Sequence, residues 1–468
     1  TATPTPTPTA PTATSTATVT PTATPTETSG EPPPDPGTVA PPLTQTGSTS
    51  LLDATAFLYT GTNPIQTGVV SGTINGRRTA VLRGKVLTRT GAALAGVRIT
   101  VLDHPEFGQT LSRVDGLFDL VVNGGGQLTL RYAKDGYLIA QRAVDAPWRD
   151  YAWLSDVMLV PLDSAVTTVD LGAAALQVAR GSVVTDTDGA RQATILFPQG
   201  TTATMVLPGG TTSPLTTLHV RATEYTIGAA GPRAMPAALP PSSGYTYAAE
   251  FSVDEAMAAG ATDIRFSRPL PVYVENFLGF PVGAAVPAGY YDRDLGHWVA
   301  SANGRVVQLL SITGGLANLD IEGNGAAADA GALAALGVTS EERAHLAQLY
   351  TPGQSLWRVP VKHFTPWDFN WPHGPPDDAE PPPGDDDDDA KTDDPNIVCG
   401  SVIGCENQTL GESLPIAGAS WRLHYQSDRV PGRKDANTLV IPVSGPTIPA
   451  SLVAMRVEVS IAGRTFQQ

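Results

Sequence analysis

At 468 residues, the chain is long enough for two to four domains. Its formal net charge of −16 is partly local, because residues 377–394 contain ten acidic side chains and one lysine. The remaining charge is ordinary for a soluble protein, and the absence of a basic stripe in the sequence disfavours nucleic-acid binding. No apolar run is long enough to cross a bilayer, so we expect no membrane span in this sequence.

Residues 1–50 are predicted to form a disordered spacer rich in threonine and proline. The segment has almost no large apolar side chains to bury, so burial cannot offset the entropy lost on ordering. Such tracts are common as stalks in exported proteins, and a plain flexible linker is the alternative interpretation. Residues 51–80 follow as a lead-in with strand character around 56–59 and 68–70.

Residues 81–163 are predicted to form a β-sandwich. Apolar and polar side chains alternate over 97–101 and over 128–132, which places one set on a buried face. The dipeptide Asp115-Gly116 predicts a hairpin between the strands on either side, because glycine accepts a positive φ without steric cost.

The turns and strands of this segment resemble those of the carboxypeptidase regulatory-like (transthyretin-like) domain. The resemblance rests on Gly84-Lys85-Val86, Gly91, Leu94–Ile99 and Asp115–Phe118. Since these are turn and core positions, the resemblance implies a seven-strand sandwich and no catalytic chemistry.

Residues 164–372 are predicted to form a second β-sandwich domain with a helical insertion at about 326–350. The segment 218–226 alternates as a strand does, and Thr339 with Glu342 three residues later has the pattern of a helix capping box. The expected fold class is therefore all-β, with tandem β-sandwich modules, one short helical insertion, and disordered N-terminal and acidic linkers.

Strand ends and turns in the second domain resemble the ZU-type β-domain of ankyrins and netrin receptors. The resemblance rests on Phe197–Thr201, Phe266–Pro269 and Tyr290–Asp292, followed by Trp298. A turn at 294–296 predicts a hairpin between the strand at 290–292 and the strand at 297–299.

The tripeptide His363-Phe364-Thr365 resembles the site at which adhesion-receptor GAIN domains and some ZU-type domains cleave their own backbone. By that resemblance Thr365 would be the nucleophile, His363 the base, and the cut would fall between Phe364 and Thr365. Pro366 opposes this chemistry, because it restricts Thr365 to extended geometry. The alternative is an ordinary strand end, and we expect the region to be no enzyme.

Asp320, Glu322 and Asn324 place oxygen ligands at alternate positions before a glycine, as in the first half of a calcium loop. Position twelve of that pattern is Gly331 rather than a bidentate glutamate, so an acidic turn before a helix is the favoured interpretation. Apart from this weak calcium candidate, we expect no cofactor.

Trp367 and Trp371 are candidates for a sugar-binding face, together with Trp357 and Phe369. The preferred alternative is an aromatic tail that packs onto its own sandwich.

Residues 373–397 are predicted to be an extended acidic linker rich in proline and aspartate. Cys399 and Cys405 follow it, and they are candidates for a disulfide in an oxidising compartment or for two unpaired thiols.

Residues 398–468 resemble the opening of an RHS (YD-repeat) shell, on the turn at Leu414–Gly418 and the strand at Trp421–Arg429. The order of segments resembles the N-terminal region of bacterial RHS and teneurin-like proteins. That resemblance implies a non-catalytic structural region of an exported protein, at the cell surface or outside the cell. Its expected partner is a downstream shell of the same polypeptide, with surface glycans or proteins if it is adhesive. No YD repeat occurs in these residues, and we interpret the sequence as a truncated fragment.

Overall fold

The structure is a computed structural model that describes residues 30–42, 49–240 and 243–372, Ile448 and four short C-terminal strands. The acidic linker, both cysteines and most of the predicted spacer lie outside the described residues. The C-terminal strands form two antiparallel pairs: β27 Gly411–Pro415 with β28 Arg422–Gln426, and β29 Glu458–Ile461 with β30 Arg464–Gln467. No helix among the described residues is long and apolar enough to cross a membrane.

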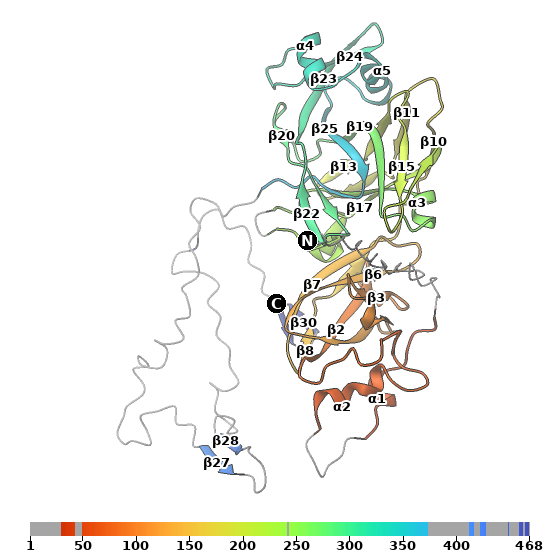
Figure 1. Cartoon of the computed structure of the whole chain (residues 1–468). Coiled ribbons are helices and arrows are strands. Elements are labelled where there is room, and N and C mark those ends of the chain that lie inside the picture. The colour runs from red at the N-terminus through yellow and green to blue at the C-terminus, as the bar shows by residue number, and fades with distance from the viewer. Residues whose placement is uncertain are drawn as a thin grey trace, which may run out of the picture.

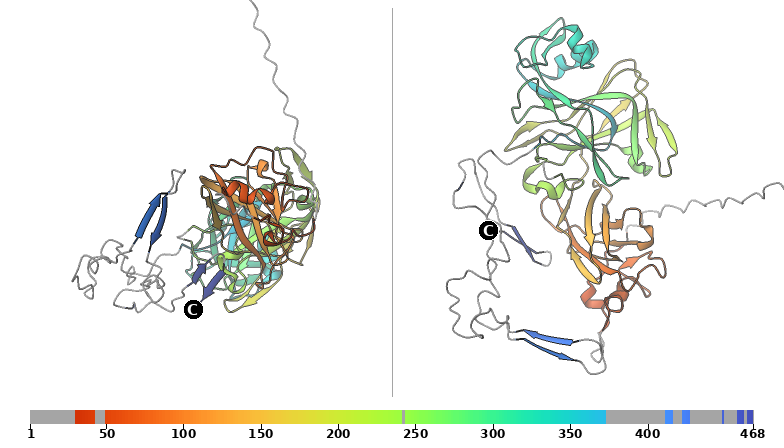
Figure 2. Two further views of the ribbon diagram at one scale, coloured as in Figure 1. Left: turned by 90° about the horizontal axis from the view of Figure 1, so that it is seen from below. Right: turned by 60° about the vertical axis from the view of Figure 1, so that its left-hand side comes forward.

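Two β-rich domains are stacked end to end, and this confirms the all-β fold class (Figure 1). The strands of the first domain lie between residues 66 and 159, and those of the second lie between residues 167 and 368. Figure 2 shows the same stacking from another side, with the second domain resting on one end of the first.

The first domain has a five-stranded sheet facing a four-stranded one. In spatial order the larger sheet contains β1 Gln66–Thr67, β4 Gln109–Leu111, β3 Arg98–Val101, β6 Gly126–Ala133 and β7 Ala140–Ala146. The smaller sheet contains β5 Leu117–Asn123, β2 Thr79–Thr88 and β8 Asp150–Trp153, with β9 Val157–Leu159 also paired to β2. The short helices are α1 Pro36–Val39, α2 Leu51–Thr55, η1 Ala56–Leu58 and η2 Pro105–Phe107.

Alternation along the strands builds the core of this domain, as predicted. Ile99 and Tyr132 from the larger sheet pack against Leu82 and Phe118 from the smaller one. The rings of Phe118 and Tyr132 meet edge to face at 5.7 Å.

The hairpin predicted at Asp115-Gly116 is wrong, although the turn itself is present. Gly116 has φ +80 and donates its backbone N–H to the carbonyl of Arg113. However, β4 before the turn pairs with β1 and β3, while β5 after it pairs with β2. The turn therefore crosses from one sheet to the other, because local turn chemistry does not decide which strands pair.

The second domain also contains two large sheets. In spatial order the six-stranded sheet contains β10 Thr167–Asp170, β17 Thr217–Glu224, β18 Ala248–Val253, β26 Pro366–Asp368, β21 Gly289–Asp292 and β22 His297–Ala300. The main path of the nine-stranded sheet contains β11 Gln177–Arg180, β14 Thr194–Phe197, β19 Asp263–Glu275, β25 Ser355–Phe364, β23 Gly304–Thr313 and β20 Ala285–Val286. Its side members are β15 Ala203–Val206, β16 Thr212–Leu215 and β24 Leu316–Asp320, and a separate hairpin contains β12 Val184–Asp186 and β13 Gly189–Arg191. The hairpin predicted at 294–296 is confirmed as β21–β22.

The helical insertion lies at the end of the second domain far from the first, as both figures show. It contains α4 Ala330–Ala335 and α5 Ser340–Leu349, whereas η3 Gly228–Ala234 and α3 Asp254–Ala258 lie elsewhere in the domain. The predicted capping box is confirmed: the Thr339 hydroxyl accepts the N–H of Glu342, and the Glu342 carboxylate accepts the N–H of Thr339. Glu342 also pairs with buried Arg358 of β25 at 2.8 Å, which ties α5 to the sheet.

Candidate functional site

The junction between the two domains combines apolar packing with several hydrogen bonds among the described residues. Its apolar part contains Leu138 and Met158 from the first domain, packed with Tyr225, Met235 and other side chains of the second. Met235 has no exposed surface and Tyr225 is 1% exposed. Because these side chains are buried together, the junction is part of the hydrophobic core and is not a small, exposed contact between two domains.

Arg142 of β7 supplies the polar part of the junction. Its guanidinium donates to the backbone carbonyls of Arg233, Met235 and Pro236 at 2.9, 3.0 and 3.2 Å. Burial lowers the pKa of Arg142, because desolvation disfavours the charged guanidinium. The backbone N–H of Gln141 also donates to the carbonyl of Pro236, at 2.7 Å. The outer edge of β7 is thus capped by a segment of the other domain.

A second set of bonds crosses the junction at the β21–β22 hairpin. The Gln141 side chain donates to the carbonyl of Arg293 at 3.0 Å and accepts the hydroxyl of Tyr291 at 2.7 Å. Arg293 in turn donates to the carbonyl of Ile139 and pairs with Glu250. Burial alone would lower the pKa of Arg293, but the Glu250 carboxylate outweighs it and raises the pKa.

The connection between the domains is itself bonded on both sides. Leu138 donates its backbone N–H to the carbonyl of Val160, and Leu162 donates to that of Gly136. One residue later, Asp163 donates its N–H to the hydroxyl of Thr223 in the second domain. The chain therefore passes between the domains without a free linker.

The residues of this junction are not among those predicted from the sequence. Arg142 and Gln141 lie in a strand of mixed polarity, where an arginine normally faces solvent. Their partners are mostly backbone carbonyls, which carry no side-chain pattern. No feature of the sequence could have identified them.

The three residues of the candidate cleavage site are brought together at the end of β25. The Thr365 hydroxyl lies 3.3 Å from Nδ1 of His363, close enough to donate to a neutral imidazole. Asp263 places Oδ1 3.9 Å from the same nitrogen, and that oxygen is buried without a hydrogen-bond partner among the described residues. Burial lowers the pKa of His363, with Asp263 opposing the effect, and the lowered pKa favours the neutral imidazole. Phe364 is buried and its ring lies 4.6 Å from that of Phe266.

The candidate calcium ligands lie in a turn that already satisfies Asp320. Its carboxylate accepts the backbone N–H groups of Glu322, Gly323 and Gly325, all within 3.0 Å. Burial raises the pKa of Asp320, but these bonds outweigh it and lower the pKa overall. Asn324 donates to the Glu322 carboxylate. Among the described residues, no three acidic, histidine or cysteine side chains form a cluster that could hold a metal ion.

The candidate sugar-binding tryptophans pack inward. Trp367 has no exposed surface and donates its indole N–H to the carbonyl of His363. Trp371 is partly buried and stacks on Phe280 at 3.8 Å between ring centroids, while Trp357 is fully buried. The two candidates therefore do not form one exposed aromatic face.

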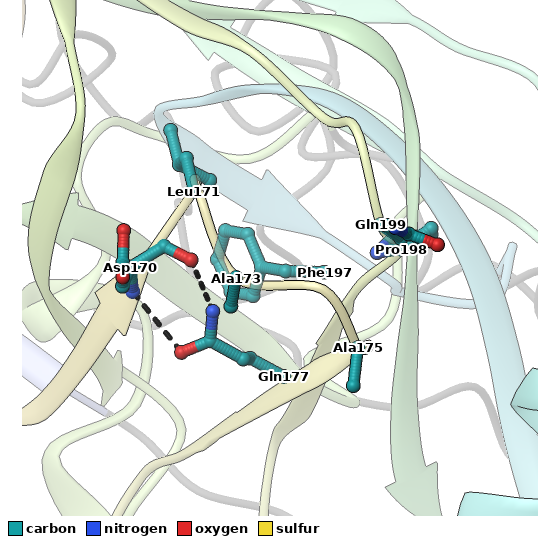
Figure 3. A pocket seen from close by; sticks show the side chains of 8 residues that line it. All are labelled: Asp170, Leu171, Ala173, Ala175, Gln177, Phe197, Pro198 and Gln199. Atoms are coloured by element: carbon teal, nitrogen blue, oxygen red, sulfur yellow. Dashed lines mark hydrogen bonds between the residues drawn. The ribbon is translucent and has the colours of Figure 1, made fainter.

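A shallow depression lies between β10, β11 and the end of β14 (Figure 3). Its sides are Leu171, Phe197 and Pro198, and Asp170 is the only charged residue in its lining. The backbone N–H of Asp170 donates to the Gln177 side chain at 3.0 Å, which closes the turn. Such a surface offers no set of convergent polar groups that would hold a ligand.

The fold and these sites define an all-β region whose two domains are joined by buried contacts. Residues 74–159 match the family described as "Teneurin TTR-like domain". The transthyretin-like resemblance is therefore confirmed within the first domain.

Individual relatives agree with the family match. The chain is 32% identical to mouse (Mus musculus) teneurin-3 over 142 residues, which are 30% of this chain and 5% of that protein. It is 41% identical to teneurin-m of Drosophila melanogaster over 87 residues, which are 19% of this chain and 3% of that protein. The chain thus covers only a small part of the length of these relatives.

Among solved structures, 3-chlorocatechol 1,2-dioxygenase of Rhodococcus opacus 1CP matches with 13% identity and a TM-score of 0.17. The match covers 21% of this chain and 65% of that one. A score this low supports no inference about this chain.

Proposed function

We propose that residues 49–372 act as a rigid, non-catalytic support in an extracellular or cell-surface protein of the RHS and teneurin-like type, of bacterial origin. The support would present or plug a downstream YD-repeat shell of the same polypeptide, and it would be adhesive if its surface binds glycans or proteins. The family match over 74–159 and the order of segments support this proposal.

The junction between the domains carries the proposal. Arg142 and Gln141 bind carbonyls of the second domain, and the connecting residues 160–163 are bonded to both domains. A support must hold its two ends at a fixed angle, and a junction of this kind does so because separating the domains would break these hydrogen bonds and expose its buried apolar side chains to water.

Calorimetry of the full chain tests the rigid support. We expect one unfolding transition for the two domains together, since they share a core. Two transitions that occur independently would contradict the proposal. The partner is tested separately by the coding sequence downstream of Gln468, in which we expect YD repeats; a stop codon there would refute the proposed shell.

Self-cleavage is a second candidate function, and the contact between Thr365 and His363 favours it. The hydroxyl oxygen of Thr365 would attack the carbonyl carbon of Phe364 while His363 accepts the hydroxyl proton and then passes it to the departing backbone nitrogen of Thr365. The peptide C–N bond would break as an ester forms, and water would then hydrolyse the ester. A gel of the purified chain should then show two fragments, and Thr365→Ala should abolish them. A single intact band before and after the substitution would reject this function.

A carbohydrate-binding role for Trp367 and Trp371 has less support, because Trp367 is fully buried. Binding on a glycan array that is lost with Trp371→Ala would favour it. Binding that does not change would remove it.

A further inference from the structure

One corner of the first domain gathers three arginines and a tryptophan from separate segments. Arg77 and Arg78 come just before β2, and Trp148 and Arg149 come just before β8, which runs parallel to β2. All four residues are exposed, and Trp148 keeps 62% of its surface accessible. Arg149 has a positive φ of 51, which is uncommon outside glycine, and it donates to the carbonyl of Arg77 at 3.4 Å.

The turn at Gly124-Gly125 fixes this corner. Arg78 donates to the carbonyl of Gly124 at 2.9 Å, and Gly124 donates back to the carbonyl of Arg78. A Cβ added to Gly125 would lie 1.7 Å from the indole nitrogen of Trp148, so the indole rests directly on the glycine backbone. Glycine is required here, and it positions the tryptophan.

The exposed aromatic surface continues along β8. Tyr151 and Trp153 lie two positions apart on the same face of the strand, 39% and 42% exposed. Arg83 of β2 stacks on both rings, with its guanidinium carbon 4.6 Å from the Tyr151 centroid and 5.5 Å from that of Trp153. Asp119 binds the other side of Arg83 and holds it in place.

The arginines of the corner have no acidic partner in the described part of the chain. Arg77, Arg78 and Arg149 take part in none of the ion pairs between described residues, and Asp150 uses its carboxylate to accept the backbone N–H of Tyr151. On a chain with a net charge of −16, a cluster of unpaired arginines is an exception. Its charge is complementary to an anion.

We propose that this corner and the adjoining face of β8 bind an acidic polysaccharide. The arginines would bind carboxylate or sulfate groups, because the N–H donors of a planar guanidinium match the spacing of two oxygens in such a group. The rings of Trp148, Tyr151 and Trp153 would stack against the apolar faces of the sugars. The aromatic side chains run from Trp148 past the turn at Arg149 and along β8, where each residue adds about 3.3 Å, and this length suits an oligomer rather than a single sugar.

The same features disfavour a nucleic acid. DNA carries one charge per about 1.7 Å of duplex, so a small basic corner on an acidic protein would meet strong repulsion around it. A polysaccharide with one charge per sugar avoids most of that repulsion while still offering surfaces for stacking.

Titration of the full chain with four polymers tests the proposal, with heat and tryptophan fluorescence as readouts. The probes are oligogalacturonate for carboxylate, dextran sulfate for sulfate, uncharged dextran, and polyphosphate for charge without sugar rings. We expect binding to one or both acidic sugars that weakens as salt is added, and none to dextran. The double variant Arg77→Gln/Arg149→Gln should weaken binding by about tenfold or more, since two charge-assisted contacts are lost.

Aromatic variants separate stacking from simple charge. Trp153→Ala and Trp148→Ala should each weaken binding of the acidic sugars several-fold, while Arg268→Gln, an exposed arginine of the second domain, should leave it unchanged. Absence of binding to both acidic sugars would overturn the proposal. So would equal binding of polyphosphate, or sugar binding that neither tryptophan variant affects. An unchanged unfolding temperature in each variant confirms that the measured loss is local.

Discussion

Replacement of Arg142 tests how strongly the junction couples the domains. Arg142→Ala removes the donor for three carbonyls of the second domain, those of Arg233, Met235 and Pro236. Hydrogen bonds from a charged donor contribute about 1.5–3 kcal/mol each, but the cost of burying the guanidinium offsets some of that gain. At about 1 kcal/mol net per bond, we expect a loss near 3 kcal/mol.

Calorimetry and urea denaturation of the full chain measure this loss. We expect the unfolding transition to move to lower temperature and to separate into two, because the second domain loses some of its attachment while its own core is intact. Cleavage by chymotrypsin after Leu159 or Leu162 should accelerate for the same reason. Asp145→Ala is the matched control, since Asp145 is exposed on the same strand.

One outcome would refute this reasoning. If Arg142→Ala costs less than about 0.5 kcal/mol and unfolds in the same single transition, the carbonyls are satisfied by water and the arginine does not couple the domains. Arg142→Lys provides a finer test. Its ammonium keeps the charge but cannot reach three carbonyls with a planar fork, so we expect an intermediate loss.

Three further substitutions test individual side chains. Burial raises the pKa of Asp368 to about 7, so ionisation of this carboxyl destabilises the fold increasingly as the pH rises from 4 to 7. Urea denaturation should therefore show that Asp368→Asn stabilises the protein by about 2 kcal/mol at pH 8 and by almost nothing at pH 3.5. Asp320→Ala should destabilise the 320–325 turn by about 1–3 kcal/mol at pH 7 and by less as the wild-type carboxylate is protonated in acid, since its folded pKa is lowered. Arg358→Met leaves Glu342 buried without its partner and should cost about 3–5 kcal/mol, most of which Glu342→Gln in the same chain should restore.

The sequence predicted strands and helix starts well, because these depend on neighbouring residues. The alternation over 97–101 and the capping box at Thr339 both appear in the structure as expected. Which strands pair with each other is harder to predict from the sequence. The turn at Gly116 forms as its chemistry requires, yet it joins two different sheets, and only the packing of the whole domain decides that.

The candidate sites also differ in whether their contacts are local or join residues far apart in the sequence. His363 and Thr365 are neighbours in sequence, so their contact follows from strand geometry alone. By contrast, Arg142 binds carbonyls that lie more than ninety residues away, and Arg77 meets Arg149 only through parallel pairing of β2 and β8. Contacts of this range depend on tertiary structure and leave no local pattern.

The parallel pairing of β2 with β9 has a mechanical consequence. The chain enters the first domain's smaller sheet at the start of β2 and leaves it at the end of β9, with Val86 opposite Val157 and Thr88 opposite Leu159. A force applied to those two ends slides the strands along each other, so all the hydrogen bonds between the two strands carry the force at once. In an antiparallel pair pulled apart from its open end, the hydrogen bonds would instead break one after another. This domain is therefore built to resist tension along the chain, which matters for any protein stretched between a cell surface and its surroundings.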